Sequence, residues 1–173
     1  MKTIMDENSI ARTLVRMTHE IIEKNKGVEN LVLVGIKTRG ETIANRIAQN
    51  IKRFEGVDVL TVGFDIRYWR DDIDKTGINK PEYDLDLNHK TVVLIDDVLY
   101  KGRTVRAAMD GVMSFGRPQS IQLAVLVDRG HRELPIRADV VGKNVPTSTE
   151  ESVKVSLQEV DGSEAVIILE RND

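Results

Sequence analysis

Two adjacent carboxylates, Asp96 and Asp97, come directly after a run of apolar and β-branched residues at 91–95. A short run of this kind, without polar alternation and ending in charge, is typical of a buried parallel strand. After a turn that contains Gly102, the apolar residues take helical spacing from Thr104 onward. Because ligands of open α/β sheets bind at the carboxyl ends of strands, we expect this strand, turn and helix to form a ligand site.

The turn at Gly102 has the composition of a phosphate cradle. The first N–H groups of a helix have no partner within the helix, and together with the positive end of the helix dipole they attract anions. Lys101 or Arg103 can add a charge and Thr104 a hydroxyl. The two aspartates would repel a phosphate, but they can accept hydrogen bonds from the hydroxyls of a sugar attached to it. The combination suggests a ribose 5-phosphate, whereas the alternative, that the aspartates only end a strand and cap a turn, leaves the Gly-Arg-Thr segment unexplained.

The segment 93–104, Val-Leu-Ile-Asp-Asp-Val-Leu-Tyr-Lys-Gly-Arg-Thr, resembles the motif with which type I phosphoribosyltransferases bind phosphoribosyl pyrophosphate (PRPP). Segments 127–137 and 142–148 narrow the resemblance to the pyrimidine operon attenuation proteins that are also uracil phosphoribosyltransferases. The resemblance covers nearly the whole chain. It implies a regulator that senses uridine nucleotides and binds RNA, and that also converts uracil and PRPP to UMP and diphosphate.

The order of the predicted strands and helices favours an α/β fold with a doubly wound central parallel sheet. In the family that the chain resembles, this is the type I phosphoribosyltransferase fold, in which helices flank the sheet and a small antiparallel addition forms the hood. We expect one domain over 1–173, with hood-forming segments near the termini and at 128–150. At the C-terminal end, an Asp-Gly turn predicts a hairpin between strands at 153–160 and 165–170.

A long loop is expected at 67–90, directly after a predicted strand at 57–66, because the segment is charged and shows no periodicity. In the family a mobile loop at this place closes over PRPP. The resemblance therefore implies that Arg70 reaches the diphosphate. Tyr68 and Trp69 are candidates for anchoring the base of the loop.

A second strand-to-helix turn, formed by Lys37, Thr38, Arg39 and Gly40, follows a predicted strand at 31–36. It lies at the same end of the sheet as the aspartates, and in the family it holds diphosphate. The two cations can neutralise the leaving group, and Gly40 lets backbone N–H groups approach it. Without the resemblance, two surface cations at the start of a helix would explain the turn equally well.

The resemblance implies a role for each part of the site. Asp96 and Asp97 hold the ribose and stabilise positive charge at its anomeric carbon, while Lys37 and Arg39 stabilise the leaving diphosphate. Mg²⁺ is the expected cofactor, bound through PRPP and diphosphate rather than by a protein cage. The substrate-binding residues, of which the last three are expected at uracil, are Thr38, Arg39, Gly40, Arg70, Asp96, Asp97, Val98, Leu99, Tyr100, Lys101, Gly102, Arg103, Thr104, Val127, Asp128 and Arg129.

The resemblance also implies an RNA face. It would bind a stem-loop in the leader of the pyrimidine operon mRNA when UMP or UTP fills the site, and so promote termination. Phosphate contacts position such a complex, and unpaired bases are read. The implied contacts are Arg16, His19, Arg132, Arg137 and Lys143. From the first helix alone, a solvated face is the simpler explanation of Arg16 and His19.

Two further questions stay open. A salvage phosphoribosyltransferase without an RNA-binding role would share the site, although three arginines within 129–137 exceed what one monophosphate substrate needs. Those cations could also make subunit contacts, and we expect a homodimer or higher homo-oligomer. Lys101 replaces a threonine of the family, so its ammonium could bind the 5-phosphate or obstruct PRPP and reduce catalysis while regulation persists.

The composition excludes several classes of protein. The chain of 173 residues has no cysteine and three histidines, which excludes disulfides and cysteine-bound zinc and makes a transition-metal site improbable. A net charge of −3 argues against indiscriminate coating of nucleic acid. Because no apolar run could cross a bilayer and no signal-peptide core follows Met1, we expect a cytoplasmic protein with no membrane partner.

Overall fold

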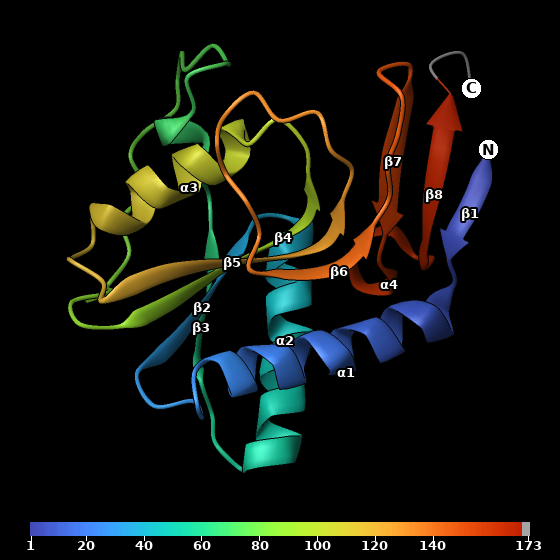
Figure 1. Cartoon of the computed structure of the whole chain (residues 1–173). Coiled ribbons are helices and arrows are strands. Elements are labelled where there is room, and N and C mark those ends of the chain that lie inside the picture. The colour runs from blue at the N-terminus through green and yellow to red at the C-terminus, as the bar shows by residue number, and fades with distance from the viewer. Residues whose placement is uncertain (171–173) are drawn as a thin grey trace.

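The structure, a computed structural model, describes residues 1–170, which contain two separate sheets (Figure 1). Five parallel strands form the larger sheet in the order β3-β2-β4-β5-β6, and three antiparallel strands form the smaller sheet in the order β1-β8-β7. The larger sheet consists of β2 (Leu31–Ile36), β3 (Leu60–Phe64), β4 (Thr91–Leu99), β5 (Ser120–Asp128) and β6 (Val140–Asn144). The smaller sheet consists of β1 (Lys2–Met5), β7 (Glu151–Ser156) and β8 (Ala165–Glu170).

Helices cover both faces of the parallel sheet, which confirms the doubly wound prediction (Figure 1). The helical elements are α1 (Glu7–Lys24), α2 (Arg39–Glu55), α3 (Arg103–Met113), the short α4 (Gln158–Asp161) and the 3-10 turn η1 (Arg67–Trp69). Leu33 packs in the cluster with α1 and α2, and its neighbour Val34 packs in the cluster with α3. Strand β2 is therefore buried on both faces, as its unbroken apolar run predicts. Within residues 1–170, no helix is both long and apolar enough to span a membrane.

Two strands at the edge of the site differ in length from the prediction. Strand β4 continues through Asp96 and Asp97 to Leu99 instead of ending at residue 95, because β5 pairs with it over that length. Strand β3 covers only Leu60–Phe64 instead of 57–66, because its pairing with β2 is confined to those residues. The aspartates thus lie within a strand and not in the loop after it.

The segment 67–90 is less irregular than predicted. Most side chains at 70–80 are exposed, but in the extended segment 81–87 every second side chain is at least partly buried. Leu87 is fully buried, and Tyr83 and Leu85 pack against the cluster on the α3 face. The sequence shows this alternation in the acidic residues that separate Tyr83, Leu85 and Leu87, so the prediction of a loop without periodicity holds only for 70–80.

Aromatic stacking anchors the base of this loop. The ring of Trp69 stacks on Phe64 with a centroid distance of 5.6 Å, and Tyr83 stacks on Phe64 at 5.0 Å. A Cβ on Gly111 of α3 would lie 2.6 Å from Phe64 Cε1, so a glycine is needed there for the helix to lie against the rings. Trp69 is thus an anchor, whereas Tyr68 is 38% exposed.

The predicted hood segments near the termini lie in the smaller sheet, but the segment 128–150 does not. Its strand β6 pairs in parallel with β5 and extends the larger sheet. Strands β7 and β8 pair antiparallel as predicted, although β7 ends at Ser156 and helix α4 precedes the turn. Gly162, with a φ of 71°, is the left-handed C-cap of α4, which explains why the Asp-Gly pair does not form a simple hairpin turn.

Candidate active site

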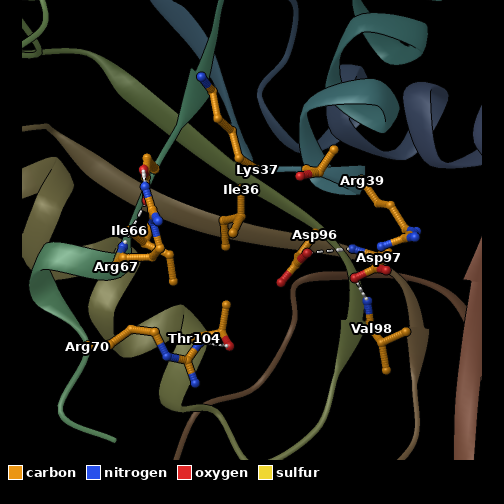
Figure 2. A pocket seen from close by; sticks show the side chains of 12 residues that line it. Ile36, Lys37, Arg39, Ile66, Arg67, Arg70, Asp96, Asp97, Val98 and Thr104 are labelled. Carbon is orange, nitrogen blue, oxygen red and sulfur yellow. Dashed lines mark hydrogen bonds and ion pairs between the residues drawn. The ribbon is translucent and has the colours of Figure 1, made fainter. Parts of the chain in front are cut away.

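A pocket of about 610 Å³ lies at the carboxyl ends of β2, β3 and β4 (Figure 2). These strands are parallel neighbours, so the loops after them open at the same edge of the sheet. The lining residues are Ile36, Lys37, Thr38, Arg39, Asp65, Ile66, Arg67, Arg70, Asp96, Asp97, Val98 and Thr104. The pocket thus brings together the aspartate pair, the cationic turn, the loop arginine and the hydroxyl of the phosphate cradle.

The two aspartates differ in burial. Asp96 is only 8% exposed, whereas Asp97 is partly exposed. The N–H of Asp97 donates to Asp96 Oδ1 at 2.8 Å, and the N–H of Val98 donates to Asp97 Oδ1 at 2.8 Å. Burial raises the pKa of Asp96 well above its ordinary value, and the charge of Asp97 raises it further. The backbone therefore orients both carboxyl groups, and the fold holds one of them in an environment that opposes its ionisation.

Two helices begin at the pocket without a side-chain cap. Their N-cap residues, Thr38 for α2 and Gly102 for α3, make no side-chain cap hydrogen bond. In α1, by contrast, Asp6 accepts from the N–H of Ser9 at 2.8 Å. Gly102 has a φ of 97°, a left-handed conformation that favours glycine. The uncapped helix starts give the pocket two positions suited to anions.

Gly40 holds the first of these helix starts close to the aspartates. A Cβ at Gly40 would lie 2.4 Å from the carbonyl oxygen of Ile95 and 3.2 Å from the Cα of Asp96. Any other residue would push the start of α2 away from β4. Gly40 itself does not line the pocket, so the structure gives it a packing role beside the predicted contact with diphosphate.

The cations of the pocket are held in different ways. The side chain of Lys37 is exposed and makes no hydrogen bond or ion pair within the described part of the chain. Arg39 donates from Nε and Nη2 to the carboxylate of Asp161 at 3.1 and 2.6 Å. Arg70 donates from Nη1 to Thr104 Oγ1 at 2.8 Å. Arg70 therefore lies against the helix start at which phosphate is predicted to bind.

A smaller recess of about 110 Å³ adjoins the pocket at the start of α3. Its lining includes the predicted phosphate-binding residues Val98, Leu99, Tyr100, Lys101, Gly102, Arg103 and Thr104. The Nζ atom of Lys101 lies 5.5 Å from the ring centroid of Tyr100, and Arg103 pairs with Asp71 and Glu133 at 3.0 and 3.2 Å. Both cations thus have partners other than the helix start, which leaves backbone N–H groups and Thr104 as the cradle.

The segment predicted to contact uracil does not line this pocket. Val127 is fully buried in the core, and Asp128 pairs with Arg132 at 2.5 Å. Arg129 is 7% exposed, and its guanidinium lies 3.9 Å from the ring centroid of Tyr100. Arg129 lines a separate cavity of about 410 Å³ between Tyr100 and the hood. The uracil contacts of this segment stay a prediction.

Besides Ile36 at the end of β2, three pocket residues, Asp65, Ile66 and Arg67, were not predicted as site residues from the sequence. Arg67 pairs with Asp65 at 2.7 Å, and this hydrogen bond lowers the pKa of Asp65. The residues follow β3, whose carboxyl end had to open at the same edge as β2. They were hidden because the strand was expected to continue to residue 66. Asp161 was missed as well, since it was assigned to a hairpin turn.

Of the two predicted RNA contacts of α1, Arg16 lies against the edge strand β6 and His19 lies against Phe54 of α2. Arg16 donates from Nη2 to the carbonyl oxygens of Gly142 and Val141 at 2.5 and 3.3 Å. His19 is exposed and stacks on Phe54 with a centroid distance of 4.4 Å. Arg16 therefore covers backbone groups of a strand that has no neighbour on that side in its sheet.

The remaining predicted RNA contacts lie on β6 and on the loop before it. Gly142 faces α1, so its neighbour Lys143 faces the opposite side of the sheet, where it is exposed. Arg137 is also exposed. Arg132 instead donates to Asp128 at 2.5 Å and to two backbone carbonyl oxygens of nearby loops. Arg16 and Lys143 thus lie on opposite faces of β6, whereas Arg132 is held by its own loop and by the carbonyl oxygen of Tyr100.

The donor set of the pocket fits Mg²⁺ only in company with a substrate. Residues 1–170 contain no group of three or more acidic, histidine or cysteine side chains that could hold a metal ion. Mg²⁺ commonly keeps several waters and binds one or two carboxylates together with substrate phosphates. Asp96 and Asp97, beside two helix starts suited to phosphate, match that mode of binding.

Comparison with known proteins shows the family and the fold of the chain. A model of the phosphoribosyl transferase domain matches residues 1–160. The chain is similar in fold to the hypoxanthine phosphoribosyltransferase of Trypanosoma cruzi, with a TM-score of 0.76 at 16% identity over 98% of this chain and 97% of that one. For a hypoxanthine-guanine phosphoribosyltransferase of Bacillus anthracis, the TM-score is 0.71 at 16% identity over 96% of each chain. The chain belongs to the phosphoribosyltransferase family.

Relatives that match nearly the whole chain assign it to one group within this family. The bifunctional protein PyrR of Clostridioides difficile is 62% identical over 171 residues, which are 96% of this chain and 97% of that protein. The bifunctional protein PyrR of Caldicellulosiruptor bescii is 56% identical over 171 residues, which are 96% of this chain and 94% of that protein. Within its family, the chain therefore groups with the bifunctional PyrR proteins.

Proposed function

We propose that this chain transfers the phosphoribosyl group of PRPP to uracil, giving UMP and diphosphate, and that it regulates pyrimidine operon expression by binding the leader mRNA when a uridine nucleotide fills the same pocket. One observation carries the proposal: the aspartate pair and two uncapped helix starts meet at one pocket, in a chain similar to bifunctional PyrR proteins. RNA binding then promotes transcription termination.

In this proposal the aspartates act on the ribose. Asp97, the more exposed of the two, accepts a hydrogen bond from a ribose hydroxyl, and Asp96 lies beneath it in the buried end of β4. Transfer creates positive charge at the anomeric carbon. Because the carboxyl groups lie at the edge of a buried sheet, their effect on that charge is stronger than it would be in water.

The two helix starts divide the phosphates between them. The start of α3 and the hydroxyl of Thr104 bind the 5-phosphate, and the start of α2 with Lys37 and Arg39 binds the diphosphate. Arg70 must leave Thr104 when the 5-phosphate binds, which frees it to reach the diphosphate. Mg²⁺, held by the substrate phosphates and the aspartates, would supply further neutralisation of the leaving group.

The regulatory half of the proposal places RNA on the β6 edge. Lys143 and Arg137 are exposed there, and Arg16 and His19 follow on α1. Such cations contact phosphates and set the register of the complex, while unpaired bases of the stem-loop are read. A homo-oligomer and a cytoplasmic location, where transcript and PRPP meet, are part of the same proposal.

Isothermal titration tests both halves. UMP, and PRPP with Mg²⁺, are titrated into the protein with and without a leader stem-loop. The proposal expects binding of both ligands and tighter RNA binding when UMP is present. Binding of PRPP and UMP without any effect of RNA would support the alternative, a salvage enzyme without a regulatory role. Absence of PRPP and UMP binding would overturn both. Light scattering on the same samples gives the oligomeric state.

A further inference from the structure

Asp161 does not line the pocket, yet it holds Arg39, the arginine proposed to face the leaving group. Its Oδ1 accepts from Arg39 Nη2 at 2.6 Å, and its Oδ2 accepts from Arg39 Nε at 3.1 Å. Oδ2 also accepts from the N–H of Leu157 at 2.8 Å, which fixes the carboxylate at the end of α4. The hydrogen bond to Asp161 raises the pKa of Arg39 and the one to Arg39 lowers the pKa of Asp161, so the pair is ionised at neutral pH.

The geometry of the pair leaves half of the guanidinium for a ligand. A guanidinium carries five N–H donors in a rigid planar fork. Asp161 takes the edge formed by Nε and Nη2, and Nη1 makes no hydrogen bond within residues 1–170. Arg39 lines the pocket on the side of Asp97, whose charge also acts on it (Figure 2). Because Arg39 lines the pocket, its remaining donors are available to a ligand that binds there.

We propose that Asp161 is a positioning residue for phosphoribosyl transfer, which aims Arg39 at the leaving diphosphate. This inference rests on the proposed function. An arginine side chain without a partner loses rotamer freedom when it binds phosphate. A carboxylate that already fixes the side chain reduces this entropic cost of binding. The hood thereby contributes to the site through a residue that touches no substrate.

A second ion pair between the same two helices provides a matched control. Arg46 follows Arg39 by two helical turns on α2 and pairs with Glu159 of α4 at 2.5 Å, and also with Glu164. Both arginines attach α4 to α2, but Arg46 does not line the pocket. Glu159→Gln therefore weakens the attachment of α4 without changing the partner of Arg39.

The test compares these variants in steady-state kinetics and calorimetry. Asp161→Asn should lower kcat/KM for PRPP about tenfold and weaken inhibition by diphosphate by a similar factor, roughly the effect of a lost ion-pair orientation. UMP affinity should change less than about twofold, since UMP has no diphosphate to contact Arg39. Glu159→Gln should stay within about twofold of the parent in all three measurements. In an Arg39→Ala background, Asp161→Asn should add nothing.

Five results would overturn the inference. Equal losses in Asp161→Asn and Glu159→Gln, or a further loss in the Arg39→Ala background, would mean that Asp161 only holds α4 in place. A gain in turnover would mean that Asp161 competes with diphosphate for Arg39. Should Asp161→Asn not fold, Asp161→Glu keeps the charge but displaces the fork, and the same pattern is expected. A parent that binds neither PRPP nor diphosphate would overturn the proposed function and this inference together, whereas an active parent indifferent to Asp161 overturns the inference alone.

Discussion

Two sets of cations in this molecule, the paired arginines of the pocket and the exposed Lys143 and Arg137 at β6 and the loop before it, are held in different ways. In the pocket, Arg39 is fixed by Asp161, and Arg70 pairs with Asp72 at 2.5 Å while it donates to Thr104. Along β6, Lys143 and Arg137 make no hydrogen bond or ion pair with any described residue. A carboxylate partner holds an arginine in one geometry, which suits a small substrate, whereas exposed cations can adapt to the backbone of a flexible polyanion.

The difference also predicts how each region responds to the removal of a charged side chain. Removal of one member of a fixed pair disturbs the geometry of its partner, so changes in the pocket should act strongly and locally. Removal of an exposed cation takes away one screened contact, so changes along β6 should act weakly and depend on salt. Four expected results, in order of decreasing effect, would sharpen or break this contrast.

The largest effect is expected at the aspartates. Asp97→Asn removes a charged acceptor for a ribose hydroxyl, and Asp96→Asn removes the buried carboxyl group beside it; we expect each change to cost about 1.5–3 kcal/mol. Both variants should therefore lose roughly tenfold to hundredfold in kcat/KM for PRPP, measured in steady state. Lys143→Ala is the control and should keep the parent rate. Unchanged PRPP affinity in both aspartate variants would remove the ribose assignment.

The next effect concerns RNA. Arg137→Ala should weaken leader binding and make its salt dependence shallower by about one unit, while UMP binding stays intact. Arg132→Ala should do the same and also lower the melting temperature, because its guanidinium binds Asp128 and two carbonyl oxygens. Gel-shift titrations at several salt concentrations measure the RNA affinity and its salt slope, with Lys2→Ala on the hood as control. Thermal unfolding measures the melting temperature. If the RNA affinity and the salt slope of both variants match those of the parent, the loop that contains Arg132 and Arg137 serves another purpose.

A smaller effect is expected on stability. The pKa of Asp96 is raised by burial, so its stabilising contribution is complete below its unfolded pKa and is lost as the pH rises through its folded pKa. Asparagine stays neutral, so Asp96→Asn should gain stability over the parent as the pH is raised from 4 toward 8, by roughly 2–4 °C in Tm for each kcal/mol recovered. Thermal unfolding across this range measures it. Parallel Tm curves for parent and variant would mean that Asp96 is not held against ionisation.

The smallest effect is expected at Lys101. Its ammonium lies over the ring of Tyr100, and backbone N–H groups with Thr104 form the cradle, so Lys101→Thr should change kcat/KM by less than about threefold. UMP should still bind. A tenfold gain, located in the use of PRPP, would instead show that the lysine obstructs the 5-phosphate and impairs catalysis in the parent.

Much of the fold and the centre of the site followed from local patterns. The run at 31–36 predicted β2 to the residue, because a strand buried on both faces leaves an unbroken apolar run. The meeting of the aspartates with the turn at 37–39 followed from parallel strands, whose carboxyl ends share one edge. Patterns of this kind depend on residues that are close in the chain, so a single sequence is enough to recognise them.

The parts that could not be predicted depend on segments far apart in the chain. Arg39 and Asp161 are joined only because α4 lies against α2, and nothing near either residue indicates the other. In the same way, Arg132 could not be recognised as a support of its own loop, since its partners include the carbonyl oxygen of Tyr100. The charge of a residue does not indicate whether its side chain is available to a ligand or is already paired within the protein.

The contact at Gly40 has a consequence for the diversification of the family. Two backbones in contact cannot approach further, and any side chain at Gly40 would drive them apart. The distance between the turn at 37–39, where we propose that diphosphate binds, and the aspartates, where we propose that ribose binds, is therefore set by the thickness of the chain itself. A descendant of this protein could acquire a new base by altering the hood or the loop at 70–80. The distance between the leaving group and the sugar would stay the same in that descendant.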